Sequence, residues 1–217
     1  MSTILWLPSS GTAAVSPTPS ATDWTLHVNT VSRPLQFTRQ NTALTTLAYN
    51  PDGADHLVAG TSMLAQFVSA ILPPQNVPAQ QILIGLRCLE VAAGNNLTLR
   101  WKIYGCNVSG STNLGTIRAI IADTVEFGTS ISGICAAAAG SSTTFNEPWR
   151  LVIELGSGGT PTTPGTHNCS MAFGDPLATG VQNLPQTADT TACTPVLIFS
   201  NPLEADFAVR PAYQLGV

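Results

Sequence analysis

The chain has 217 residues, of which 44% are hydrophobic and 9% charged, and its formal net charge is −4. It has no basic run that could displace the counterions of a phosphate backbone, so we expect neither nucleic acid nor a membrane surface as a partner. The length suits one domain with a sizeable core, and 27 threonines beside a single lysine, Lys102, favour strands over helices.

The first 24 residues combine a short apolar run with several prolines. The run consists of Ile4, Leu5, Trp6 and Leu7, whereas a signal peptide needs about 7–15 apolar residues after a basic start. The prolines that follow keep the backbone extended. We therefore predict an extended N-terminal arm over residues 1–24 whose apolar run binds another protein surface. The alternative is a disordered tail with one apolar patch.

The body of the chain, residues 25–202, is cut by turn-forming residues into short segments in which apolar and polar residues alternate. The clearest segments are residues 25–31, 62–70, 82–88, 97–105, 114–121, 149–156, 167–173 and 193–200. They predict about eight or nine half-buried strands, so the expected fold is an all-β, antiparallel β-sandwich of jelly-roll type. The alanine-rich residues 134–140 fit either a helical turn or a packed loop.

The same alternation predicts which side chains fill the space between the two sheets. The predicted core contains Leu99, Trp101, Ile103, Trp149, Leu151, Ile153 and Phe173. The opposite face of these strands carries Lys102, Tyr104 and Glu154. We expect Glu154 to lie beside Arg150 there, as a solvated or interfacial ion pair.

The last residues, 203–217, also alternate, which is too regular for a disordered end. The side chains predicted to bind a partner on one face of this extended segment are Phe207, Val209, Tyr213 and Leu215. Pro211 cannot donate a ladder hydrogen bond, which confines such a strand to the edge of a sheet. We predict a C-terminal arm that adds a strand to a neighbouring subunit. A strand that completes the chain's own sheet is the alternative.

No constellation of residues in the sequence points to catalysis or to a metal. His167 and Cys169 share one face of a predicted strand, but Met171 and Phe173 continue that face, which favours core packing over a zinc site. The acidic residues lie mostly at turns and strand ends rather than as a pair across a cleft. We expect no enzyme, no metal and no cofactor, and we expect the five scattered cysteines to be buried thiols.

A β-sandwich can also bind sugars through exposed aromatic side chains that stack on the sugar rings. The candidate side chains are Trp24, Tyr49, Tyr104 and Tyr213. An outward cluster of Trp24 and Tyr104 beside an acidic residue would favour this carbohydrate-binding alternative.

Several segments, taken together in their order, resemble a family of tailed-bacteriophage virion proteins. The segments are LWLPSSGTAAVSP, TSMLAQFVSAIL, LIGLRCLEVAAGNNLTLRWKIYGCNVSG, LGTIRAII, WRLVIELG and PVLIFS. The resemblance covers most of residues 4–200 and implies a jelly-roll body in a structural component of a virus particle. The segment after PVLIFS extends past the usual end of the family.

The resemblance and the low charge lead to one expected function. We expect a non-enzymatic virion protein, made in the host bacterial cytoplasm and located in the virion. The favoured role is a capsid cement (decoration) protein, a homotrimer that stabilises the shell by bridging neighbouring subunits of the major capsid protein. The alternative is a tail or fibre module that binds a host surface glycan.

Overall fold

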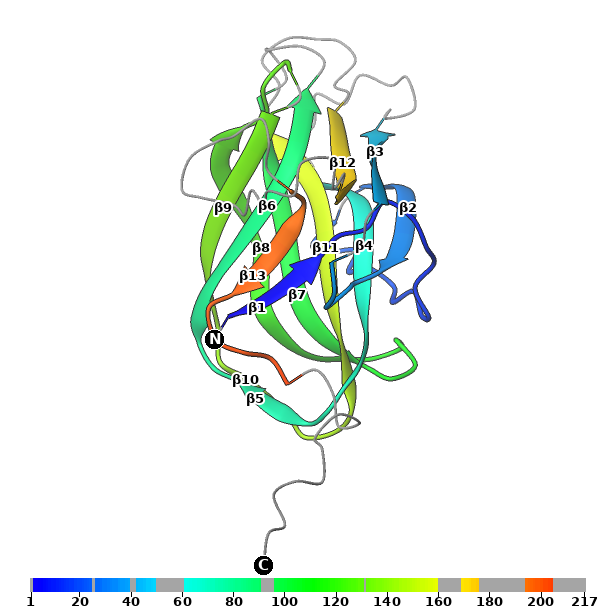
Figure 1. The fold of residues 1–217 in the computed structure, drawn as a ribbon, viewed down its shortest axis with the longest axis vertical. Coiled ribbons are helices and arrows are strands. Elements are labelled where there is room, and N and C mark those ends of the chain that lie inside the picture. The colour runs from blue at the N-terminus through cyan, green and yellow to red at the C-terminus, as the bar shows by residue number, and fades with distance from the viewer. Residues whose placement is uncertain are drawn as a thin grey trace, which may run out of the picture.

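The computed structural model describes residues 2–24, 26–39, 42–49, 61–90, 96–130, 132–159, 169–175 and 194–204. These residues contain thirteen strands and no helix. Figure 1 shows two layers of strands packed face to face. In the part of the chain that is described, nothing meets the length and hydropathy required of a membrane-spanning helix.

Six strands form the first large sheet, here called sheet A. Their order is β1-β13-β6-β12-β3, and β9 also pairs with β6. The strands are β1 (Thr3–Trp6), β3 (Thr42–Tyr49), β6 (Gln80–Glu90), β9 (Ser132–Gly140), β12 (Cys169–Asp175) and β13 (Val196–Phe199). All the pairings in sheet A are antiparallel.

Five strands form the facing sheet, here called sheet B, in the order β2-β4-β11-β7-β8. They are β2 (Leu26–Pro34), β4 (Thr61–Leu72), β7 (Leu97–Asn107), β8 (Asn113–Glu126) and β11 (Trp149–Gly159). The pairings are antiparallel except that β2 runs parallel to β4. A small third sheet pairs β5 (Gln75–Val77) with β10 (Thr143–Phe145).

The predicted antiparallel β-sandwich is confirmed, with one parallel pair and more strands than expected. The alanine-rich segment is neither a helical turn nor a loop, because it forms most of β9 and pairs along β6 from Gln80 to Leu86. Pairing with a buried neighbour outweighs the low strand propensity of alanine. The jelly-roll type remains a prediction. The observed strand orders, β1-β13-β6-β9 in sheet A and β4-β11-β7-β8 in sheet B, are compatible with that type.

The predicted core is confirmed. The side chains that are fully buried between the sheets include Leu99, Trp101, Ile103, Trp149, Leu151, Ile153 and Phe173. Trp149 also stacks on Phe145, with ring centroids 3.8 Å apart and an interplanar angle of 11°. Gly105 leaves the space for this stack, since a Cβ at that position would clash with Cε1 of Phe145.

The prediction that residues 1–24 reach out to another protein is corrected by the structure. Residues 3–6 form β1, which pairs antiparallel with β13 of the same chain. Leu5 and Leu7 belong to the chain's own core, and Trp6 is only 6% exposed. The apolar run therefore completes its own sandwich, because the edge of β13 offers main-chain hydrogen bonds and the core offers apolar contacts.

The predicted C-terminal arm, residues 203–217, begins within the described part of the chain. Leu203 is buried in the core, and its N–H donates to Oγ1 of Thr3 over 2.7 Å. Residues 205–217, with Phe207, Val209, Tyr213 and Leu215, lie outside the described residues, so their role stays a prediction.

Candidate functional site

After β1 the chain leaves sheet A and crosses to the outer face of sheet B. We call residues 8–24 the N-terminal strap, and its dark blue trace is visible on the β2–β4 side of the molecule (Figure 1). Ala13 and Val15 of the strap pack against an apolar group on that face. The group consists of Val68, Tyr104, Cys106 and Val152. The N–H of Ala13 donates to the carbonyl of Ser32 over 3.1 Å.

Glu154 lies on β11 beneath this strap and is fully buried. Nε1 of Trp24 donates to Oε2 of Glu154 over 2.7 Å. The hydroxyl of Tyr104 donates to Oε1 over 3.0 Å, and Nε2 of Gln66 donates to the same oxygen over 3.3 Å. A buried carboxylate needs such donors to replace its lost hydration. We call these four residues the Glu154 cluster.

The cluster also ties the strap to the sheet through main-chain groups. Nε2 of Gln66 donates to the carbonyl of Pro17 over 2.9 Å, and Oγ of Ser32 donates to Oε1 of Gln66 over 3.1 Å. Gly156 makes room for the Trp24 ring, since a Cβ there would lie 2.6 Å from Cζ3 of Trp24. The buried position of Trp24 therefore depends on the carboxylate of Glu154 as a hydrogen-bond acceptor and on the absence of a side chain at Gly156.

Tyr104 has its pKa raised, first by burial and then by the nearby charge of Glu154 and its hydrogen bond to that carboxylate. The phenol therefore stays protonated at neutral pH and serves as a hydrogen-bond donor. Its role in this structure is to satisfy Glu154 rather than to exchange a proton.

A second charged contact lies beside the cluster. Nζ of Lys102 is 2.5 Å from Oδ2 of Asp23, and the two side chains are 9% and 25% exposed. The ammonium group also lies 5.0 Å from the centroid of the Tyr104 ring. Lys102 on β7 stands directly opposite Glu154 on β11. The strap thus meets sheet B with an ion pair next to a hydrogen-bonded carboxylate.

The alternation of β7 and β11 correctly placed Lys102, Tyr104 and Glu154 on the face away from the core. The prediction of a solvated or interfacial ion pair with Arg150 is wrong, because the strap covers Glu154. Arg150 instead donates from Nε to the carbonyl of Val108 and from Nη1 to that of Ser69, over 2.9 and 3.0 Å. Nothing in the local pattern indicated a covering segment.

Of the four aromatic residues that we considered for sugar binding, the two whose side chains are described, Trp24 and Tyr104, are not on the surface. Trp24 and Tyr104 meet beside an acidic residue as the carbohydrate-binding alternative requires, but they are only 1% and 4% exposed. The side chain of Tyr49 and the whole of Tyr213 lie outside the described residues. The buried pair therefore offers no face on which a sugar could stack.

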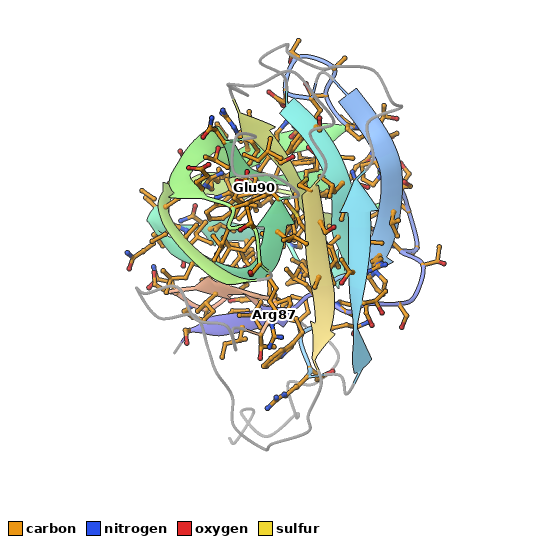
Figure 2. The ribbon with its side chains drawn as sticks, turned by 90° about the horizontal axis from the view of Figure 1, so that it is seen from above. Arg87 and Glu90 are labelled. Carbon is orange, nitrogen blue, oxygen red and sulfur yellow. The ribbon has the colours of Figure 1, made fainter. Side chains whose placement is uncertain are left out.

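A second set of buried polar groups lies at the C-terminal end of β6. Figure 2 shows Glu90 inside the sandwich and Arg87 on the side of sheet A. Oε2 of Glu90 accepts a hydrogen bond from the N–H of Leu97 over 3.1 Å, and burial raises the pKa of its carboxyl. Sγ of Cys169 lies 3.3 Å from Oγ of Ser157.

Burial also raises the pKa of the Cys169 thiol, to about 12, and that of Cys88. A thiol that stays protonated is neither a nucleophile nor a metal ligand. The described residues hold no group of three or more His, Cys, Asp or Glu side chains arranged for a metal. His167 and Cys193 lie outside them, so the expected absence of a metal stays a prediction.

No protein-family model and no curated protein matches this chain. A solved structure of an α-amino acid ester hydrolase labelled with selenomethionine is similar over 94% of this chain, at a TM-score of 0.47 and 11% identity. The VP2 subviral particle of infectious bursal disease virus is similar over 72% at a TM-score of 0.25 and 14% identity. The structure of the Gx strain of that virus is similar over 72% of this chain, at a TM-score of 0.27 and 12% identity.

This chain spans 36% of the length of each of these three structures. Their TM-scores lie below 0.5 and their identities do not exceed 14%, so they support no activity and no assembly for this chain.

Proposed function

We propose that the protein is a non-enzymatic structural protein of a tailed-bacteriophage virion. It acts as a capsid cement protein that binds the outside of the shell as a homotrimer and bridges neighbouring subunits of the major capsid protein. The observation that carries this proposal is the small number of exposed charged side chains among the described residues.

Six charged side chains in the described part are buried. They are Arg33, Lys102, Arg118, Arg150, Glu90 and Glu154. Among the residues whose side-chain exposure the structure describes, the exposed charged side chains are those of Glu126, Glu147 and Glu204, and Asp23, Arg39, Arg87 and Arg100 are half-buried. The remaining exposed positions are mostly Ser, Thr, Asn and Ala.

Such a surface suits permanent contact with other protein. A freely dissolved domain depends on charged residues for solubility, with about 25–35% of its surface charged. A surface with few charges loses less hydration energy on burial than a highly charged one, and repulsion between identical copies is weak. Many weak contacts repeated over a shell then add to a strong attachment.

Counting the copies of the protein in purified particles tests this role. A cement protein is expected at a copy number comparable with that of the major capsid protein, by quantitative protein staining of the particles. A handful of copies per particle would contradict the proposal and favour the tail or fibre module. Absence from purified particles would contradict both.

The trimer is tested separately. Sedimentation equilibrium of the purified full-length chain is expected to give three times the monomer mass. A monomer at all concentrations would contradict the homotrimer without affecting the proposed place in the virion.

A further inference from the structure

The ion pair between Lys102 of sheet B and Asp23 of the strap is unusually short. Their atoms Nζ and Oδ2 are 2.5 Å apart, whereas hydrogen bonds between an ammonium and a carboxylate usually measure about 2.7–2.9 Å. Lys102 is the only lysine in the chain. We propose that these two side chains condense into an amide, an isopeptide bond from Nζ of Lys102 to Cγ of Asp23.

Both partners are held in place by the fold. Lys102 lies in the middle of β7, between β11 and β8. The N–H groups of Asp23 and Trp24 both donate to the carbonyl of Ser20, over 3.1 and 3.0 Å, which forms a turn at the end of the strap. Trp24, the next residue after Asp23, is then fixed by its 2.7 Å hydrogen bond to Glu154.

Fixing two reacting groups next to each other replaces a bimolecular reaction by an intramolecular one. Well-oriented groups reach effective concentrations of about 10⁵–10⁸ M, which greatly accelerates an otherwise slow condensation. Glu154 acts here as a positioning residue, since it accepts a hydrogen bond from Trp24 and holds the residue next to Asp23 in place. Lys102 is also largely shielded from water.

The reaction requires no cofactor, oxidant or external base. One proton passes along the short hydrogen bond from the Lys102 ammonium to the Asp23 carboxylate, which leaves a neutral amine and a neutral acid. The nitrogen lone pair attacks Cγ, so the Nζ–Cγ bond forms and one Cγ–O bond breaks. The leaving oxygen departs as water with the proton of the acid and one proton of the amine.

The Tyr104 ring borders the reacting nitrogen, with its centroid 5.0 Å from Nζ of Lys102. We expect the bond to form slowly after folding. Once formed, it links positions 79 residues apart and prevents the strap from leaving sheet B.

Mass spectrometry of the aged, folded, full-length protein tests the proposal. The intact protein is expected to be lighter than its sequence by one water molecule. Trypsin does not cut before Pro34, so the linked product contains the peptide that ends at Arg39 joined to residues 101–118. Without the bond, cleavage after Lys102 releases residues 101–102 and 103–118 as separate peptides.

Lys102→Arg is the matched control, because arginine keeps the charge and the contact with Asp23 but forms no amide under these conditions. The variant is expected to show the full sequence mass, as is Asp23→Ala. Circular dichroism before digestion establishes that each protein is folded. A folded wild-type protein with its full mass and free peptides 101–102 and 103–118 would overturn the proposal. Neither result bears on the copy number in virions.

Discussion

Glu154 stands on a strand whose alternation turns its side chain away from the core, and yet it is among the most buried charges of the molecule. Its carboxylate accepts hydrogen bonds from Trp24, Gln66 and Tyr104. A buried network of this kind is favourable only while every member is satisfied. Part of the energetic coupling between the strap and sheet B is therefore expected to pass through this side chain.

Glu154→Ala tests that coupling. The change leaves the buried donors of Trp24 and Tyr104 without their acceptor, at about 1–3 kcal/mol for each donor. We expect the free energy of unfolding to fall by about 3 kcal/mol or more in a urea titration. Glu147→Ala is the control, because Glu147 is exposed and its loss is expected to change stability by less than about 0.5 kcal/mol. Equal effects of the two changes would contradict the role of Glu154.

Glu90 is the second buried acid, and it predicts a dependence of stability on pH. Burial is the main cause that raises its pKa above the ordinary value of 4.5, the charge of Glu126 adds to this, and the hydrogen bond from Leu97 opposes it. The folded state therefore holds this proton more tightly than the unfolded state. Stability falls as the pH rises from about 4.5 through the higher pKa of the folded state.

Glu90→Gln is expected to remove this fall while keeping an acceptor for the Leu97 N–H. In thermal melts from pH 4 upward, the melting temperature of the variant should rise relative to that of the wild type across that pH range. It should remain higher than that of the wild type at higher pH. Glu126→Gln is expected to shift the window to lower pH, since it removes the neighbouring charge. A constant difference between the Glu90→Gln variant and the wild type at every pH would contradict the prediction.

Among the strands, β1 changes the interpretation of the N-terminus most. An apolar run followed by prolines is compatible with an arm on another subunit and with an edge strand of the same sheet. The structure places it on β13, with Leu5 in the core and Ile4 half-buried. The first residues therefore contribute to the stability of the isolated chain.

Leu5→Ala and Ile4→Ala separate these two interpretations. Truncating the buried Leu5 side chain is expected to lower the free energy of unfolding by about 2–5 kcal/mol. Truncating the neighbouring Ile4 is expected to lower it clearly less, because Ile4 is only half-buried. Chemical denaturation of the purified chain measures both. An arm that binds only a partner would leave the unfolding of the isolated chain unchanged in both variants.

For the molecule as a whole, the sparsely charged surface and the predicted C-terminal arm point to contacts between copies. The arm leaves the described fold at Glu204, whose N–H donates to Oε1 of Gln75 at the start of β5 over 3.0 Å. Its alternating residues suit addition to the edge of a sheet. The exposed surface offers few charges that would oppose the approach of another copy.

Deletion of residues 205–217 tests the arm. We expect loss of the oligomer in sedimentation, with the melting temperature of each sandwich unchanged, since the arm is predicted to bind a neighbour. A less stable monomer would favour the alternative, a strand in the chain's own sheet. An unchanged oligomer with unchanged melting would contradict both.

The fold and the core could be predicted from the sequence because alternation is a local property. Side chains on one strand point to opposite faces whatever lies beyond them, so Trp101, Trp149 and Phe173 were correctly assigned to the core. Composition and the resemblance likewise led to an all-β sandwich without any knowledge of strand partners.

What covers each face depends on contacts between residues far apart in the chain. Alternation placed Glu154 opposite the core, but its burial depends on Trp24, 130 positions away. The Ala-rich segment became a strand because β6 offered it an edge, and residues 3–6 stayed on their own sandwich because β13 did. An edge strand bonds to whichever chain presents a matching backbone, and the sequence of the strand does not specify which one that is.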